Sequence, residues 1–145
     1  MAAPHLFLEA SKVPCANDEK PRIGRERGDE RIARATNAML TRIDARWTVR
    51  SLAKIAGMSR AAFARLFWKE HGAPPLKWLT AQRMRRASDL FADGDGTLSN
   101  IAKVVGYESE FALSRAFKRH FGVAPAVYRS QLRVGRAEPT MALAA

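Results

Sequence analysis

Cysteine is almost missing from the sequence, and this scarcity excludes two kinds of protein. Cys15 is the single cysteine among 145 residues, so the chain cannot form an internal disulfide. It has no cluster of cysteine and histidine at the spacing of a zinc site, and no glycine-rich loop of the kind that cradles phosphate. The sequence therefore predicts a protein of a reducing compartment that has no metal and no other cofactor.

Long apolar runs are missing as well. No apolar segment approaches the length that a helix needs to span a bilayer. The segment Met1–Leu8 lacks the basic start and the long apolar stretch of a signal peptide. We therefore expect a cytoplasmic protein with no membrane partner.

Residues that could carry catalysis are few. His5, His71 and His120 are the only histidines, and they lie far apart with no carboxylate motif beside them. No pairing of a nucleophile with a base is visible in the sequence. The sequence therefore predicts a protein that is not an enzyme.

Basic residues, by contrast, are abundant. The chain has 25 Lys and Arg against 14 Asp and Glu, which gives a formal net charge of +11. Residues 29–145 hold twenty basic and ten acidic side chains, whereas residues 1–28 hold five and four. Such an excess attracts polyanions, which are nucleic acid, an anionic membrane surface or an acidic partner. Because the excess lies outside the first 28 residues, we expect the folded part of the chain to be the basic part.

Helical periodicity begins near residue 29. Residues 1–28 contain several Pro and Gly and predict a linker or a disordered tail. Apolar residues at helical spacing then predict a first helix over 29–43. Capping residues and terminating glycines predict further helices, which span about 49–56, 60–71, 75–93, 98–105 and 110–121. No segment alternates with period two for long, so the fold class is predicted to be all-α, with residues 132–145 as a disordered C-terminal tail.

One segment of the sequence occurs twice. The first copy runs from Thr48 to Trp78 and the second from Thr97 to Tyr128. At an offset of 49 residues, Thr48, Ala53, Lys54 and Gly57 match Thr97, Ala102, Lys103 and Gly106. One extra residue in the second copy then makes the offset 50. At that offset, Ala62, Arg65, Phe67, Gly72 and Pro75 match Ala112, Arg115, Phe117, Gly122 and Pro125. Each copy reads as a short helix, a turn opened by Gly, and a second helix capped by Ser, which is the pattern of a helix-turn-helix unit. For the aromatic pair Trp78 and Tyr128 we expect core packing rather than stacking on bases.

The second helix of each unit separates into two faces. In the first unit Phe63, Leu66 and Phe67 form an apolar stripe, and in the second unit Leu113, Ala116 and Phe117 do so. Arg65 and Arg115 then occupy equivalent positions on the opposite, outward face. Arginine is well suited to bidentate contact with guanine in the major groove. At the start of the first helices, Ser51 and Asn100 stand where a Glu would complete a capping box, so we expect a small loss of helix stability there.

The sequence resembles the DNA-binding domain of the AraC/XylS family. The most specific part of the resemblance is GYESEFALSRAFKRHFGVAP, from Gly106 to Pro125, and the first unit matches over WTVRSLAKIAGMSRAAFARLF, from Trp47 to Phe67. Arg83, Met84, Ala87 and Leu90 match the helix that links the two units. The resemblance implies a seven-helix domain over about residues 29–131, in which a long central helix joins two helix-turn-helix subdomains. It also implies two recognition helices that enter successive major-groove faces about 34 Å apart on one side of the DNA.

The resemblance also implies the residues that contact DNA. The positions that would face bases are Arg60, Ala61, Ala64, Arg65, Phe111, Ser114 and Arg115. Lys69, Lys118 and Arg119 lie one turn further along the recognition helices, so we expect them to contact phosphate, and we expect the same of Thr48, Ser59, Thr97 and Ser109. The first unit departs from the family's pattern at two places. Ala61 and Ala64 can touch a thymine methyl but offer no hydrogen bond, and Trp68 stands where the second unit has Lys118.

These features predict a sequence-specific regulator of transcription that binds double-stranded DNA. The resemblance implies contact with RNA polymerase and activation as the usual result, and a single chain would suffice for DNA binding. The alternative is a truncated regulator that acts as an antagonist or as a weak, nonspecific DNA binder, because many members of such families carry an effector domain before this one. Activation or repression, and monomer or dimer, stay open at this point.

Overall fold

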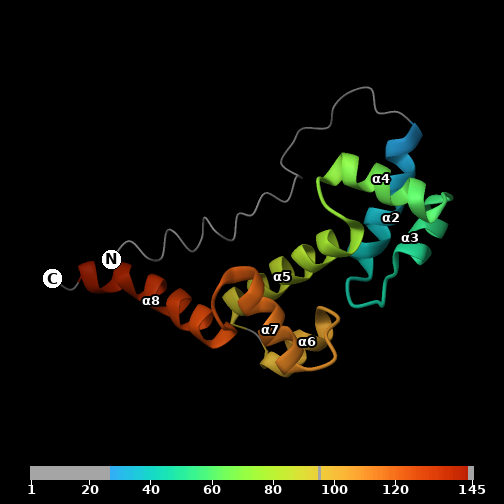
Figure 1. Cartoon of the computed structure of the whole chain (residues 1–145). Helices are drawn as coiled ribbons and strands as arrows, with labels where there is room; N and C mark the ends of the chain where they lie inside the picture. The colour runs from blue at the N-terminus through green and yellow to red at the C-terminus, as the bar shows by residue number, and fades with distance from the viewer. Residues whose placement is uncertain (1–26, 95, 144–145) are drawn as a thin grey trace. The chain divides into compact units, whose positions relative to one another are not determined.

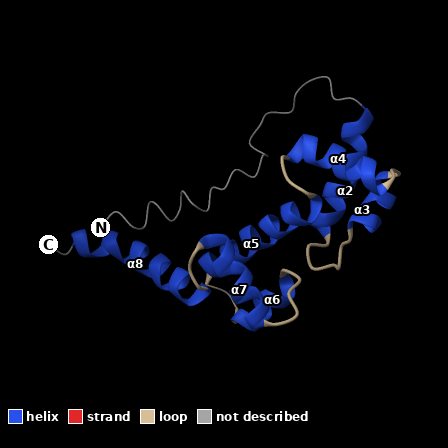
Figure 2. Cartoon of the chain, in the orientation of Figure 1, coloured by secondary structure: helices blue, strands red, loops and turns tan. Residues whose placement is uncertain are grey.

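Seven helices make up all the regular structure in the part of the chain that the computed structural model describes, residues 27–94 and 96–143 (Figures 1 and 2). The helices are α2 (Arg27–Thr41), α3 (Val49–Ala56), α4 (Arg60–His71), α5 (Pro75–Asp93), α6 (Leu98–Val104), α7 (Glu110–Phe121) and α8 (Pro125–Leu143). The all-α prediction is therefore confirmed. Within the same residues, no helix is both long enough and apolar enough to cross a membrane.

Most helix boundaries lie where the capping residues predicted them. The hydroxyl oxygens of Thr48, Ser59, Thr97 and Ser109 each accept a hydrogen bond from the backbone N–H three residues later, at 3.0 to 3.2 Å. At the other ends of α3, α4 and α7, the residue that follows the helix is a glycine with φ between 67° and 80°. Most L side chains are strained at such φ values, so glycine ends these helices at low cost.

The prediction of a deficient cap at Ser51 was wrong. Thr48 and Ser51 form a complete capping box, in which the Thr48 N–H donates to Ser51 Oγ at 3.0 Å and the Ser51 N–H donates to Thr48 Oγ1 at 3.0 Å. A serine hydroxyl therefore supplies the acceptor that a Glu side chain supplies elsewhere. For Asn100 only one half of such a box is present, the bond from its N–H to Thr97 Oγ1 at 3.2 Å.

The first described helix ends two residues earlier than the sequence predicted. α2 ends at Thr41, and the carbonyls that follow accept hydrogen bonds from a distant side chain. Arg83 Nε donates to the Ile43 carbonyl at 2.9 Å and Arg83 Nη2 donates to the Ala45 carbonyl at 2.8 Å. Trp47 Nε1 donates to the Arg42 carbonyl at 2.8 Å. These bonds satisfy the loop backbone without a further helical turn.

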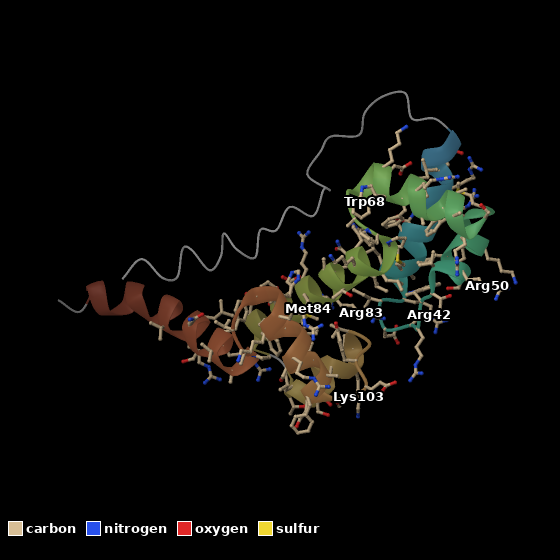
Figure 3. All side chains as sticks on the ribbon, in the orientation of Figure 1. Arg42, Arg50, Trp68, Arg83, Met84 and Lys103 are labelled. Atoms are coloured by element: carbon tan, nitrogen blue, oxygen red, sulfur yellow. The ribbon has the colours of Figure 1, made fainter. Side chains whose placement is uncertain are left out.

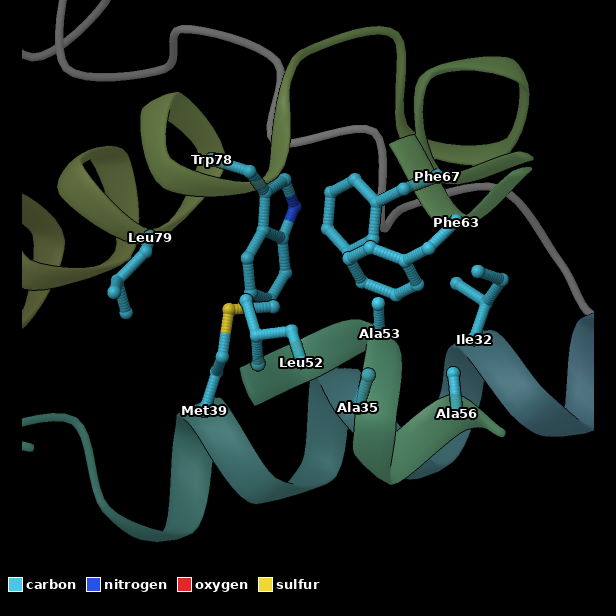
Figure 4. Close-up of a cluster of buried hydrophobic side chains, with 10 residues drawn as sticks. All are labelled: Ile32, Ala35, Met39, Leu52, Ala53, Ala56, Phe63, Phe67, Trp78 and Leu79. Atoms are coloured by element: carbon cyan, nitrogen blue, oxygen red, sulfur yellow. The ribbon is translucent and has the colours of Figure 1, made fainter. Parts of the chain in front are cut away.

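The described residues divide into two compact units at the middle of α5, one that ends at Arg83 and one that begins at Met84. In the first unit, α2, α3, α4 and the start of α5 enclose one apolar cluster. Figure 4 shows the ring of Trp78 beside that of Phe67, next to the side chains from α2 and α3. The buried members are Ile32, Ala35, Met39, Leu52, Ala53, Ala56, Phe63, Phe67, Trp78 and Leu79.

The second unit encloses its own apolar cluster. The end of α5 contributes three of its members, and the rest come from α6, α7, α8 and their connections. The buried members are Met84, Ala87, Phe91, Ile101, Ala102, Val105, Leu113, Phe117, Phe121 and Tyr128. The matched small residues Ala53 and Ala102 are both buried, as expected where two helices approach closely. Trp78 and Tyr128 are buried too, which confirms core packing for both rings.

A cluster of three rings recurs at equivalent positions in the two units. In the first unit the centroid of Phe67 lies 4.4 Å from that of His71 and 5.8 Å from that of Trp78. In the second unit the centroid of Phe117 lies 4.5 Å from that of Phe121 and 5.3 Å from that of Tyr128. The repeat in the sequence is therefore a repeat in the packing as well.

The predicted division of the chain into a domain and two tails stays a prediction. The predicted N-terminal tail lies almost wholly outside the described residues, which begin at Arg27. At the other end, α8 continues past residue 132, where the predicted tail begins, and reaches Leu143.

Candidate nucleic-acid interface

The second helices of the two units, α4 and α7, present matching exposed faces. From position 61 to 70 and from position 111 to 120, each residue has the same degree of burial as its counterpart 50 residues away. Phe63 and Phe67 are buried in the first unit, as are Leu113 and Phe117 in the second. Since these buried residues anchor one side of each helix, the other side is left open to a partner.

The residues predicted to face bases all lie on these open sides. Those that are exposed are Arg60, Ala61, Arg65, Phe111 and Arg115, and those that are half-buried are Ala64 and Ser114. On a helix, residues three and four positions apart are neighbours on one face. The structure therefore brings the predicted base-facing residues together within each unit. Their role as base contacts stays a prediction.

The residues predicted to contact phosphate fall into two groups, and all are exposed. Thr48, Ser59, Thr97 and Ser109 are the N-caps of α3, α4, α6 and α7. A hydroxyl that accepts a hydrogen bond from its helix can still donate its own hydrogen to a phosphate oxygen. The second group is made of cations near the C-terminal ends of α4 and α7, namely Lys69, Lys118 and Arg119.

Exposed residues that the sequence analysis did not place in the site also lie on the two units. Trp68 on α4 is 55% exposed, and Arg50 on α3 is exposed as well. Both side chains are labelled in Figure 3. Lys54 and Lys103 are exposed at matching positions of α3 and α6. The signal for the lysine pair was present in the repeat, where the two residues align. A repeat position alone did not say whether their side chains would reach solvent.

Side-chain contacts connect separate elements within each unit. In the second unit, Arg129 Nη2 donates to the Gly96 carbonyl at 2.8 Å, and its guanidinium lies 4.7 Å from the centroid of the Phe91 ring. In the first unit, Thr36 Oγ1 and His71 Nε2 are 3.3 Å apart. These contacts connect α8 to the loop before α6, and α2 to the end of α4.

Two groups of the second unit have a displaced pKa. Burial lowers the pKa of His120 below its usual 6.5, because desolvation disfavours the charged imidazolium. Burial likewise raises the pKa of Tyr128 above 10.0; a hydrogen bond with the Ser88 side chain opposes this shift and the charge of Asp89 adds to it. Both groups are therefore mainly neutral at pH 7, so neither adds to the charge of this unit.

Ligands for a metal ion do not come together in this interface. Over residues 27–94 and 96–143, no three His, Cys, Asp or Glu side chains are grouped so that they could hold an ion. The side chains of α4 and α7 carry guanidinium, ammonium, hydroxyl and apolar groups, together with the carboxylates of Glu70 and Glu110 and the imidazoles of His71 and His120, and cations outnumber carboxylates. Such a set can bind and recognise a polyanion.

The chain is similar to proteins of one family. A family model described as a helix-turn-helix domain matches residues 52–131. The RCS-specific HTH-type transcriptional activator RclR of Escherichia coli (strain K12) is 46% identical over 87 residues, which are 60% of this chain and 31% of RclR. The HTH-type transcriptional regulator AlkR of Acinetobacter baylyi is 45% identical over 85 residues, which are 59% of this chain and 28% of AlkR. The matched region thus spans less than a third of the length of these relatives.

Solved structures show the same fold. The DNA-binding domain of AdpA, described as a global transcriptional factor and solved in complex with a target DNA, matches with a TM-score of 0.69 and 34% identity. That match covers 72% of this chain and 95% of the AdpA domain. An AraC-type regulator from Chromobacterium violaceum matches with a TM-score of 0.65 and 25% identity, over 72% of this chain and 93% of that one.

Proposed function

The chain belongs to the AraC/XylS family of sequence-specific, DNA-binding transcription regulators, and on that premise we propose that one polypeptide reads two blocks of a duplex through α4 and α7. Each block is a short stretch of major groove, and the blocks lie about one helical turn apart. The family is one of regulators rather than of enzymes, so the product of binding is a change in transcription.

The observation that carries the proposal is the match between the exposed faces of α4 and α7. Arg65 and Arg115 are exposed at equivalent positions of these helices. A guanidinium can donate two hydrogen bonds to guanine O6 and N7, which is the commonest base-specific contact in the major groove. We therefore assign guanine recognition in the first block to Arg65 and in the second block to Arg115.

Phosphate contacts would hold the protein in register on the duplex. The exposed hydroxyls at the N-caps and the exposed cations of α4 and α7 supply donors for this purpose. The net charge of +11 adds a general attraction to DNA that weakens as salt rises. We assign these contacts to Thr48, Ser59, Lys69, Thr97, Ser109, Lys118 and Arg119.

The effect on transcription that we propose is activation through contact with RNA polymerase. Two relatives support this choice by their names, RclR as a transcriptional activator and a lactose operon transcription activator of Staphylococcus xylosus, 30% identical over 106 residues. Because the target would be the bacterial chromosome, the compartment is the cytoplasm.

Selection of bound duplexes from a random DNA pool at near-physiological salt tests the proposal. We expect an enriched motif of two blocks whose centres lie about one helical turn, roughly 10 base pairs, apart. Weak binding without an enriched motif would contradict it, and would favour a truncated regulator held to DNA mainly by phosphate charge. The Ala61 and Ala64 pair is the feature of the chain that favours this second candidate, because neither residue can donate a hydrogen bond to a base.

A further inference from the structure

Phe111 exposes an unusually large apolar surface. Its side chain is 70% exposed, more than any other large apolar residue among those described, and Val134 follows at 58%. Other phenylalanines of the same helix, Phe117 and Phe121, are buried in the core of the second unit. Because contact of apolar surface with water is unfavourable, a partner that covers such a ring lowers the free energy.

The position of Phe111 in its helix indicates what covers it. Phe111 is the second residue of α7, which begins at Glu110. Recognition helices of helix-turn-helix proteins contact base edges mainly with their N-terminal residues. Arg115 follows four positions later and is also exposed, so the ring and the guanidinium are neighbours on one face. A base edge in the major groove therefore fits the position better than an unrelated protein surface.

The chemistry of a phenyl ring narrows the choice of base. The ring has no group that donates or accepts a conventional hydrogen bond, so it cannot read the polar edge of a base. In the major groove the apolar group that distinguishes a base is the 5-methyl of thymine. The same methyl occurs on 5-methylcytosine, whose polar edge is that of cytosine.

We propose that Phe111 makes the second unit selective for a pyrimidine with a 5-methyl group. This inference rests on the proposed reading of duplex DNA by α7. Four residues along a helix correspond to about 6 Å, and base pairs rise by about 3.4 Å. The methylated pyrimidine therefore lies one or two base steps from the guanine that Arg115 contacts.

The first unit provides an internal comparison. Ala61 occupies the position equivalent to Phe111 and is also exposed, but it carries only a methyl group. Less apolar area would be covered there when a thymine is bound. The effect of a pyrimidine methyl is therefore smaller in the block read by α4 than in the block read by α7.

The test uses the full chain and the duplex obtained from the random pool. Deoxyuridine replaces each thymine in turn, which removes the methyl and keeps every hydrogen-bonding group. At one position in the second block, we expect the loss of one buried methyl to weaken binding by roughly three- to fivefold. In the Phe111→Ala variant the difference between the thymine and deoxyuridine duplexes should fall to the smaller one expected in the first block, where Ala61 stands. Because Phe111 is exposed, this variant should keep its fold, and its melting temperature checks that.

Further arms and controls separate the possible results. Cytosine and 5-methylcytosine at the same position show whether the methyl is read on either ring or on thymine alone, and either result supports the proposal. Deoxyuridine in the first block is the matched control. The ratio of binding to thymine and deoxyuridine duplexes there should be the same for Phe111→Ala as for the unaltered protein. Equal binding of thymine and deoxyuridine by the unaltered protein, or a preference for thymine that is undiminished in Phe111→Ala, would overturn the inference while the enriched motif stands. A pool that yields no motif would overturn the proposed function together with this inference.

Discussion

Between the two helix-turn-helix units, the interiors agree closely in detail, while the exposed faces agree in their pattern of burial but differ in several side chains. Phe67 of the first unit and Phe117 of the second are fully buried, and each lies at the centre of a three-ring cluster. Even where the ring type differs, as for His71 and Phe121, the ring lies at nearly the same distance from its central phenylalanine. Packing therefore constrains shape more tightly than residue type.

On the exposed faces, side chains of different chemistry occupy some of the equivalent positions. Ala61 and Trp68 of the first unit stand where the second unit has Phe111 and Lys118, and all four are exposed. Packing constrains these exposed positions less than the core positions, so different side chains fit at each of them. The second face has a phenyl ring near the start of its recognition helix, whereas each face carries three cations, Arg60, Arg65 and Lys69 in the first and Arg115, Lys118 and Arg119 in the second. Because Phe111 offers more apolar surface than Ala61, we expect the second unit to contribute more to the selectivity of DNA binding.

The largest effect is expected from breaking the two cores one at a time. Phe117→Ala and Phe67→Ala each remove a fully buried ring, which should lower the free energy of unfolding by about 3–5 kcal/mol. Urea denaturation followed by circular dichroism measures the loss. If the interiors are as alike as their ring distances indicate, the two losses should be similar. A loss below about 1 kcal/mol for either variant would mean that its core refills the space.

The next largest effect concerns the matched arginines. Arg115→Ala should weaken binding by about 1–3 kcal/mol and relax the preference for one base in the second block, and Arg65→Ala should do the same in the first block. Arg→Lys at each position is the control, because it keeps the charge but loses the bidentate geometry. Binding assays on duplexes altered at single positions measure the change. Unaltered base preference in Arg115→Ala would show that α7 does not read bases with this residue.

A smaller effect should follow from making the first face more like the second. Trp68→Lys places a cation where the second unit has Lys118. Binding should strengthen to a similar extent for all sequences, and the slope of log K against log salt should become steeper by about 0.9. Lys118→Ala is the matched opposite change and should make the slope shallower by about the same amount. Salt slopes that stay the same in both variants would exclude phosphate contact by side chains at positions 68 and 118.

The smallest effect concerns the helix caps that begin the two units. Ser51→Ala removes the hydroxyl that accepts from the Thr48 N–H, and should cost about 0.5 kcal/mol of stability because the site is exposed. Asn100→Ser offers the Thr97 N–H a serine hydroxyl as acceptor. This variant should raise the stability by a similar amount, about 0.5 kcal/mol. Denaturation midpoints of the two variants measure both changes. Loss of stability in Asn100→Ser would contradict the equivalence of the two caps.

Local chemistry was enough to predict most of the helices. Thr48, Ser59 and Ser109 were recognised as caps from sequence because a capping side chain and a terminating glycine act within a few residues. The end of α2 could not be predicted in this way, since Arg83 satisfies the carbonyls of Ile43 and Ala45 from about 40 residues away. Non-local hydrogen bonds of this kind leave no periodic signal in the sequence.

The candidate site was predictable in its outline. Once the apolar stripe of α7 was identified from Leu113 and Phe117, the outward position of Phe111 and Arg115 followed from helical geometry. The capping box at Ser51 was missed, because the expected partner was a longer acidic side chain. What each exposed residue binds does not follow from the fold, since solvent exposure permits many side chains and requires none.

The most direct test of the account is the mass of the complex on a two-block duplex, measured by analytical ultracentrifugation during a titration. If both recognition helices of one chain bind the duplex, the complex should contain one chain for each duplex. Scrambling the sequence of either block should then weaken binding. Two chains for each duplex, or a block that can be scrambled without loss of affinity, would contradict the claim that α4 and α7 of a single polypeptide both read DNA.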